Sequence, residues 1–311
     1  MTTTAASGKP LLHRLAAYLY RRRGLRLLLL VGLPVTWLVG VYGGSLVSLL
    51  AQSFFRLDSF AGTIDRTPTL ATWRDLFTAA NMTVAGRTLA MAAAVTVFSV
   101  FLAFPLAYYI ARYATPRVKS LMVLGVLLPL WSSYLVRVYS WKLILAAEGI
   151  VNWFLSRMGL GGALRTLLAL PVVGGPSLSV SSLGQFVVFV YIWLPYMVLP
   201  IQTALERVPR SFMEASADLG ARPAATFRRV VWPLAIPGVA AGSIFTFSLT
   251  LGDYIIPTVI GDSSPFIGLA IYAQQGVAGN IPLAAAFAFV PIVIMSLYLA
   301  IARRLGAFEA L

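Results

Sequence analysis

Long apolar runs alternate along the chain with short polar segments that are rich in arginine. A bilayer-spanning helix needs about 20 mostly apolar residues, and runs of this kind lie at about 27–53, 84–111, 120–147, 180–205, 236–260 and 281–302. A weaker apolar stretch at 164–173 contains Arg165 and follows Arg157 and three glycines, so we expect short interfacial helices at 148–179 instead of a further crossing. The pattern predicts an all-α integral membrane protein with six transmembrane helices.

The composition also indicates a membrane protein. Hydrophobic residues make up 59% of the chain and charged residues only 11%, so a soluble core could not bury the apolar surface. Residues 1–26 are polar and then basic, and they precede the first apolar run. That run, at 27–53, is too long for a signal peptide and lacks a clear small-residue cleavage site, so we expect a retained first transmembrane helix.

The positive charge of the chain follows the expected topology. The net charge is +14, and sixteen of the 24 lysines and arginines fall before the first span, in the 112–119 and 206–232 loops, or after the last span. The positive-inside rule places these segments, and with them both termini, in the cytoplasm. Topology therefore explains the charge, and no nucleic-acid partner is expected. The absence of cysteine and the presence of one histidine argue against thiol chemistry, disulfides and histidine-based catalysis.

A polar segment at 207–233 separates the fourth and fifth spans. Ser211 and Glu214 have the spacing of a capping box, which predicts a helix over 211–219. Gly220 supplies a left-handed helix end, and Pro223 can occupy the first position of a second short helix. Arg228 and Arg229 would then lie at the negative end of that second helix. The segment is thus expected to form two short helices joined at Gly220.

This segment resembles the signature of the type I importer permeases of ATP-binding-cassette (ABC) transporters. The signature reads Glu-Ala-Ala, three residues, Gly, nine residues, then Ile-x-Leu-Pro, and the spacing is kept here in Glu214-Ala215-Ser216, Gly220 and 230–233. Three positions depart from it, namely Ser216, Val230 and Trp232. In that family the loop docks on a cytoplasmic ATPase, which implies a coupling role for Glu214, Ala215, Ser216, Asp218 and Gly220. The alternative is an amphipathic helix that only lies on the bilayer surface.

The third and fifth spans carry candidate cargo residues. Trp131, Tyr134, Val138 and Trp141 recur at helical spacing, with Arg137 and Lys142 beside them. They form either a cation-binding aromatic face or an aromatic belt at the membrane surface. Asp253 falls within the apolar fifth span, where a carboxylate costs about 2.5–3.5 kcal/mol, so it should face a pathway or a partner charge. The alternative for Asp253 is an ion pair with Arg137 that only fixes helix packing.

Both stretches also resemble the spermidine/putrescine branch of these permeases. The matching residues are Pro129, Trp131, Ser132-Ser133, Arg137 and Tyr139 in the third span and Gly252-Asp253-Tyr254 with Pro257 in the fifth. The resemblance implies a polyamine cargo whose pathway includes Asp253, Tyr254, Trp131, Tyr134 and Arg137. Alternative cargoes, carried by neighbouring branches, are amino-acid derivatives, thiamine and ferric ion. A stand-alone secondary transporter is the alternative from another class.

The resemblance also implies a domain plan and a set of partners. A permease core at 84–304, with coupling helices at 207–233, follows the first transmembrane helix at 27–53. The implied complex lies in a bacterial inner membrane and contains two ATP-binding subunits, a second similar or identical permease and an extracytoplasmic substrate-binding protein. The chain lacks a Gly-x-x-x-x-Gly-Lys-Ser/Thr loop. We therefore expect no enzyme activity and no bound cofactor in this chain, with ATP and magnesium held by the ATPase.

The expected topology can be tested directly because the chain has no native cysteine. Ala221→Cys should resist an impermeant thiol reagent in intact cells and react after permeabilisation. Ala61→Cys, in the predicted external loop at 57–82, serves as the positive control and should react in intact cells. Labelling of Ala221→Cys in intact cells would contradict the six-span topology.

Overall fold

The computed structural model describes Tyr20 and residues 23–58, 60–262 and 264–304, so the expected basic segment 1–26 lies largely outside the described residues. Most of the described chain is helical. Its first part contains α2 (Arg23–Trp37), α3 (Gly44–Ser53), the antiparallel strands β1 (Arg56–Asp58) and β2 (Thr63–Asp65), and α4 (Ala71–Leu76). The remainder contains α5 (Ala79–Arg112), α6 (Pro116–Leu127), α7 (Tyr134–Ile144), α8 (Ile150–Arg157), α9 (Gly161–Leu168), α10 (Ser182–Arg207), α11 (Arg210–Asp218), α12 (Pro223–Thr226), α13 (Trp232–Gly252), α14 (Ile255–Val259), α15 (Ile267–Tyr272) and α16 (Ile281–Arg304).

The helices account for the six predicted spans. Within the described residues, five helices are long and apolar enough to cross a membrane, at 30–53, 79–112, 182–207, 223–252 and 281–303. The bent pair of α6 and α7 makes a sixth if it is counted as one span. α8 and α9 have eight residues each and are too short to cross. The segment at 148–179 therefore adds no crossing, as expected.

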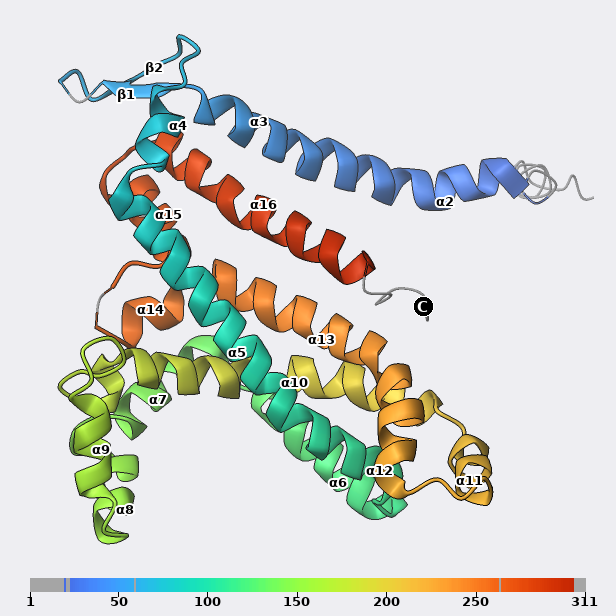
Figure 1. Ribbon diagram of the computed structural model, residues 1–311. Helices are drawn as coiled ribbons and strands as arrows, with labels where there is room; N and C mark the ends of the chain where they lie inside the picture. Colours follow the sequence, from blue (N-terminus) through green and yellow to red (C-terminus); the bar gives the residue numbers. More distant parts are fainter. Residues whose placement is uncertain (1–19, 21–22, 59, 263, 305–311) are drawn as a thin grey trace, which may run out of the picture.

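The two ends of the helix bundle carry different segments (Figure 1). The beginning of α2, the end of α16 and the short helices α11 and α12 lie at one end, which we call the α11 end. The β1–β2 hairpin, α4, α14 and α15 lie at the other, which we call the α15 end. The polar segment between the fourth and fifth spans thus shares an end with the outermost described turns of α2 and α16, an arrangement that the six-span topology requires.

The centre of the bundle is a close packing of α5, α10 and α13, each of which contacts the other two. Small residues allow this approach, as they do between membrane helices generally. A Cβ added at Gly238 on α13 would lie 2.6 Å from the carbonyl oxygen of Pro200 and 2.6 Å from the Cβ of Ala204, both on α10. Gly242 is similarly close to Met197. The two helices pack at a distance that tolerates no side chain at these glycines.

The prediction of a continuous third span at 120–147 is wrong. α6 ends at Leu127, a 3-10 turn covers Leu128–Trp131, and Ser132 is extended, so α6 and α7 are bent by 96°. Pro129 explains the break, because it has no N–H to donate to the preceding turn and it disfavours helical geometry in the residue before it. Trp131 therefore does not share the predicted helical face, whereas Tyr134, Val138 and Trp141 remain together on α7 and pack in one buried cluster.

The fifth span differs from its prediction in a similar way. The helix that contains α13 begins at Pro223 and ends at Gly252, whereas the prediction was one helix over 236–260. Asp253 is extended, and the chain resumes as the short helix α14. Asp253 therefore lies at a break between two helices and not within a continuous one.

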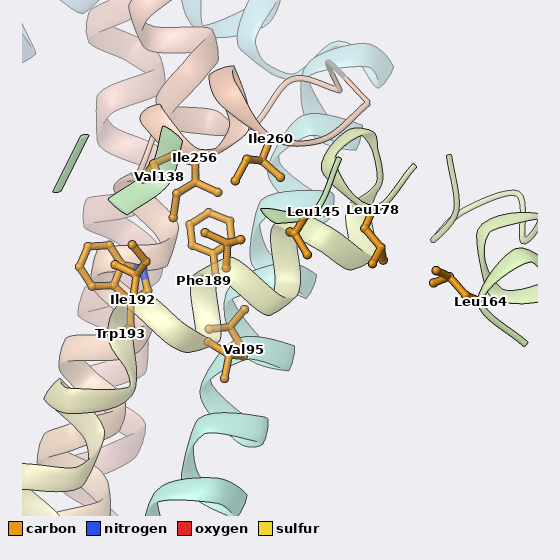
Figure 2. Close-up of a cluster of buried hydrophobic side chains, with 12 residues drawn as sticks. Val95, Val138, Leu145, Leu164, Leu178, Phe189, Ile192, Trp193, Ile256 and Ile260 are labelled. Atoms are coloured by element: carbon orange, nitrogen blue, oxygen red, sulfur yellow. The ribbon is translucent and has the colours of Figure 1, made fainter. Parts of the chain in front are cut away.

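A buried hydrophobic cluster holds the broken segments against α10 (Figure 2). Phe189, Ile192 and Trp193 of α10 are its centre, and Val138 from α7 and Ile256 from α14 pack beside them. Phe189, Ile192, Val138 and Ile256 have no exposed surface. The helices that resume after the two breaks, α7 and α14, are thus both packed on α10.

The close packing of α10 and α13 predicts a cost for even one added methyl group. Gly238→Ala should destabilise the protein by about 1–3 kcal/mol, since the new Cβ overlaps backbone that cannot rotate away. The thermal unfolding midpoint in detergent should fall by several degrees. Gly125→Ala in α6 is the matched control, because a Cβ there meets nothing within 4 Å and alanine favours helix. Equal midpoints for the two variants would contradict the close packing.

Candidate functional site

The loop between α10 and α13 forms a tight joint at Gly220, as predicted from the sequence. Gly220 has a φ of 74°, in the left-handed region that glycine favours. Its N–H donates to the carbonyl of Ala217 (2.8 Å), and the N–H of Ala221 donates to the carbonyl of Ser216 (3.1 Å). This pair of hydrogen bonds is the Schellman arrangement that ends a helix. Pro223 then starts α12 at its first position, also as expected.

Two details of the predicted loop are wrong. The capping box of Ser211 and Glu214 does not form, because Pro209 is the residue that precedes the helix and Ser211 already lies inside its first turn. Arg228 and Arg229 are not at a helix end, since a π-helical turn over Phe227–Val231 runs on into α13. Pro233 accounts for this turn, because it cannot donate a hydrogen bond to the preceding turn and the helix widens to accommodate it.

A side-chain hydrogen bond that the sequence did not predict closes the joint. The hydroxyls of Ser216 and Thr226 lie 2.8 Å apart and connect α11 to α12. Ser216 is the position at which this chain departs from the second alanine of the family signature. A hydroxyl at Ser216 followed by Thr226 was the only signal for this contact in the sequence.

α11 presents an unusual outer surface. Leu219 is 88% exposed and Phe212 is 51% exposed, although both are large and apolar. Glu214, Ala215 and Asp218 are exposed on the same short helix. α11 lies at the edge of the bundle (Figure 1), where Met213 packs against a buried cluster and no residue of the helix is fully buried. A helix that combines exposed apolar and acidic residues in this way has the character of a docking surface.

A second candidate region lies at the break after α13, which we call the Asp253 pocket. It has a volume of about 320 Å³ and is lined by Tyr134, Trp193, Ser248, Leu249, Gly252, Asp253, Tyr254 and Ile255. The hydroxyl of Tyr134 donates a hydrogen bond to the Asp253 carboxylate. The backbone N–H groups of Ile255 (2.7 Å) and Ile256 (3.0 Å) donate to the Oδ1 atom of Asp253. The carboxylate therefore caps the start of α14 and also faces an aromatic pocket.

Aromatic rings form two stacked pairs around this carboxylate. The rings of Tyr134 and Trp193 stack with centroids 5.8 Å apart and an interplanar angle of 19°. Tyr254 stacks on Tyr272 of α15 with centroids 5.2 Å apart. The pocket offers one carboxylate and the faces of electron-rich rings, which together suit a cation.

The structure brings together three of the five predicted pathway residues. Tyr134, Asp253 and Tyr254 line the Asp253 pocket, whereas Trp131 lies before the break in the third span and is 80% exposed. Trp193 and Ser248 also line the pocket, although they are not among the predicted pathway residues. The sequence gives little reason to single out Trp193, because aromatic residues are common on membrane helices for packing alone.

Arg137 is close to the pocket but does not pair with Asp253. Its guanidinium carbon lies 5.9 Å from the centroid of the Tyr134 ring. Among the described residues, the ion pair that the structure contains is between Lys119 and Glu206, so the alternative of an Asp253–Arg137 ion pair is not formed. The Nε and Nη1 atoms of Arg137 are buried and have no hydrogen-bond partner.

The comparisons with known proteins agree with this architecture. Residues 103–307 match the family described as the binding-protein-dependent transport system inner membrane component, and this chain belongs to that family. It is therefore a permease subunit of an ABC importer, a membrane component of transport without its own ATPase site.

Individual relatives make the assignment more specific. The chain is 52% identical over 311 residues to the inner membrane ABC transporter permease protein YdcU of Escherichia coli (strain K12), covering 100% of this chain and 99% of the relative. It is 27% identical over 237 residues to the spermidine/putrescine transport system permease protein PotB of Haemophilus influenzae, covering 76% and 79% of the two chains. A solved bacterial ABC transporter that imports the acidic polysaccharide alginate contains a chain with the same fold, with a TM-score of 0.62, 17% identity and coverage of 94% and 99%.

Proposed function

We propose that this permease moves a small cationic solute, a polyamine such as spermidine or putrescine, into the cytoplasm of a bacterium. The observation that carries the proposal is Asp253, a carboxylate held at the break between α13 and α14 in a pocket walled by aromatic rings. The names of relatives such as PotB support the same cargo class. An extracytoplasmic binding protein would deliver the cargo from the side of the α15 end.

The chemistry of the pocket suits an ammonium group. An ammonium ion that leaves water must regain charge stabilisation, which Asp253 supplies directly. The ring faces of Tyr134, Trp193 and Tyr254 add about 0.5–2 kcal/mol for each cation–π contact. A cation that binds Asp253 competes with the Tyr134 hydroxyl, which already donates to the carboxylate.

An amino-acid derivative is the second candidate cargo. The specific observation in its favour is the guanidinium of Arg137, which has two buried nitrogens without partners beside Tyr134. A solute that carries both an ammonium and a carboxylate could bind Asp253 and Arg137 at the same time. A polyamine lacks the anionic group.

For the energy source, we infer that α11 docks on a cytoplasmic ATPase subunit and that the α11 end faces the cytoplasm. The docking residues would be Glu214, Ala215, Ser216, Asp218 and Gly220, supported by the exposure of α11 and the rigid joint that follows it. Two such ATPases would hold ATP and magnesium, and a second permease, similar or identical, would complete the pathway in the inner membrane.

The docking role of α11 predicts that two changes uncouple transport without preventing membrane insertion. Gly220→Pro forces φ to about −65° and removes the N–H that ends α11, and Glu214→Arg reverses an exposed charge on the proposed docking face. In both variants, ATPase copurification or cargo-stimulated ATP hydrolysis should fall by about tenfold, equivalent to about 1.4 kcal/mol. Asp262→Arg is the control, because it makes the same charge change at the α15 end. Unchanged binding and stimulation in both loop variants would show that α11 is not the coupling element.

The cargo proposal is tested by uptake in proteoliposomes that contain the whole complex with its binding protein. Asp253→Asn should lower uptake of labelled spermidine or putrescine by about tenfold or more, because the ammonium loses its counter-charge. The double variant Asp253→Asn with Arg137→Gln should be no better than Asp253→Asn alone, since the structure contains no ion pair between the two residues. Full uptake in the double variant would reduce Asp253 to a structural role. If the unmodified complex takes up a labelled ω-amino acid and no polyamine, the second candidate replaces the first.

A further inference from the structure

The segment of α5 at the α11 end contacts both ends of the α10–α13 loop. The loop leaves α10 at Val208 and joins the helix of α13 at Phe227. The last residue of α5, Arg112, lies at the first of these points, and the aromatic residues Phe104 and Tyr108 lie at the second. One transmembrane helix therefore holds both points at which the loop is attached to the bundle.

At the first point, Arg112 caps the end of α10. Its Nη2 atom donates to the carbonyl oxygens of Leu205 (2.8 Å) and Val208 (2.9 Å). The last carbonyls of a helix have no partner within the helix, and a positive charge there also stabilises the negative end of the helix dipole. Val208 and Leu205 are buried, and Pro209 follows at once as the residue that starts α11. Arg112 thus fixes the direction in which the chain leaves α10 for α11.

At the second point, four aromatic rings pack together. Phe227 meets Phe104 edge-on at 5.7 Å and Tyr108 edge-on at 5.7 Å, and Phe104 also lies 5.1 Å from Trp232. Edge-to-face contacts of this kind fix the relative orientation of the rings. The Ser216–Thr226 hydrogen bond then connects this attachment back to α11. α11, α12 and α5 are therefore connected by short side-chain contacts throughout.

α5 reaches the opposite end of the bundle with equal specificity. It is 34 residues long, and near its start the hydroxyl oxygen of Thr88, which is fully buried, accepts a hydrogen bond from the N–H of Ile267 (3.0 Å) at the beginning of α15. α15 carries Tyr272, whose ring stacks on Tyr254 of the Asp253 pocket. A displacement of α5 along its axis would act on both the loop and the wall of the pocket.

We propose that α5 transmits movement of α11 across the membrane together with α10 and α13, which continue directly from the loop, and that Arg112 is the positioning residue that joins α5 to this movement. The proposal rests on the coupling role of α11 but not on the identity of the cargo. It predicts that α5 and the α10–α13 loop move as one body between the nucleotide-free and ATP-hydrolysing states. Coupling of this kind must be demonstrated by a measured link between the two sites and not by proximity alone.

The test measures a distance in the complete complex with its ATPase subunits. Nitroxide labels on Ala80→Cys, at the start of α5, and Ala221→Cys, in the loop, should report the same distance without nucleotide and after trapping with ADP and vanadate. With Arg112→Gln the loop is released, and the distance should broaden and differ between the two states. Arg112→Lys retains the positive charge but lacks the planar guanidinium group, so its distance distribution should lie between those of the unmodified chain and Arg112→Gln. Arg117→Gln, an exposed arginine in the next helix, is the matched control and should behave like the unmodified chain.

A functional measurement separates positioning from folding. Arg112→Gln should keep its ATPase subunits bound and its basal ATP hydrolysis, while stimulation by the binding protein falls by about tenfold, or about 1.4 kcal/mol. Normal stimulation, or a state-dependent distance in the unmodified chain, would overturn the proposal. Loss of the assembled complex in both Arg112 variants would also overturn it, since Arg112 would then serve folding alone. If Glu214→Arg keeps its ATPase bound and stimulated, the coupling role of α11 is wrong. If Glu214→Arg loses ATPase binding or stimulation while Arg112→Gln behaves normally, α11 keeps its coupling role and only the role of α5 is removed.

Discussion

Backbone N–H and C=O groups inside a bilayer have no water to bind, so each must find a partner within the protein. This requirement makes the two broken spans the most constrained parts of the structure. After α13 the Asp253 carboxylate supplies the acceptor that the start of α14 lacks. The resumed helices α7 and α14 both pack on α10 through buried side chains (Figure 2). The helix can be interrupted at Asp253 because the carboxylate accepts hydrogen bonds from backbone N–H groups that the break would leave without partners. The Asp253 pocket lies at this interruption.

The sequence predicted those parts of the fold that depend on local chemistry. Apolar run length predicted the spans, and Gly220 and Pro223 predicted the joint between α11 and α12, because backbone geometry at glycine and proline depends on few neighbours. The two breaks were missed because the apolar composition of a segment is the same whether its helix is continuous or broken. Pro129 marked the first break, but Pro105, Pro195 and Pro200 lie inside continuous helices, so proline alone does not decide. The capping box failed because the N-cap position is Pro209, two residues before Ser211, the N-cap that the spacing of Ser211 and Glu214 requires.

The candidate site was only partly predictable for a different reason. Asp253 was found because an intramembrane carboxylate is rare, and Tyr254 follows it directly in the chain. Trp193 and Ser248 reach the pocket only through the packing of α10 and α13, which no spacing within one segment reveals. Trp131 was placed wrongly because its assignment assumed a helix that the chain interrupts. Arg112 gave no signal at all, since its partners are backbone carbonyls and not side chains.

The hydrogen bond from Tyr134 to Asp253 sets the thermodynamics of any exchange at this carboxylate. A buried acceptor without a donor would hold the first cation that reached it, because release would restore an unsatisfied charge. With the proposed cationic cargo, a departing cation would be replaced by the tyrosine hydroxyl, so the pocket would lose one interaction and regain a hydrogen bond. This competition would lower the affinity of the carboxylate for a cation, because the hydrogen bond from Tyr134 must break before the cation takes its place. A carrier built in this way favours turnover over retention, which suits a protein that receives its solute from one compartment and must part with it in another.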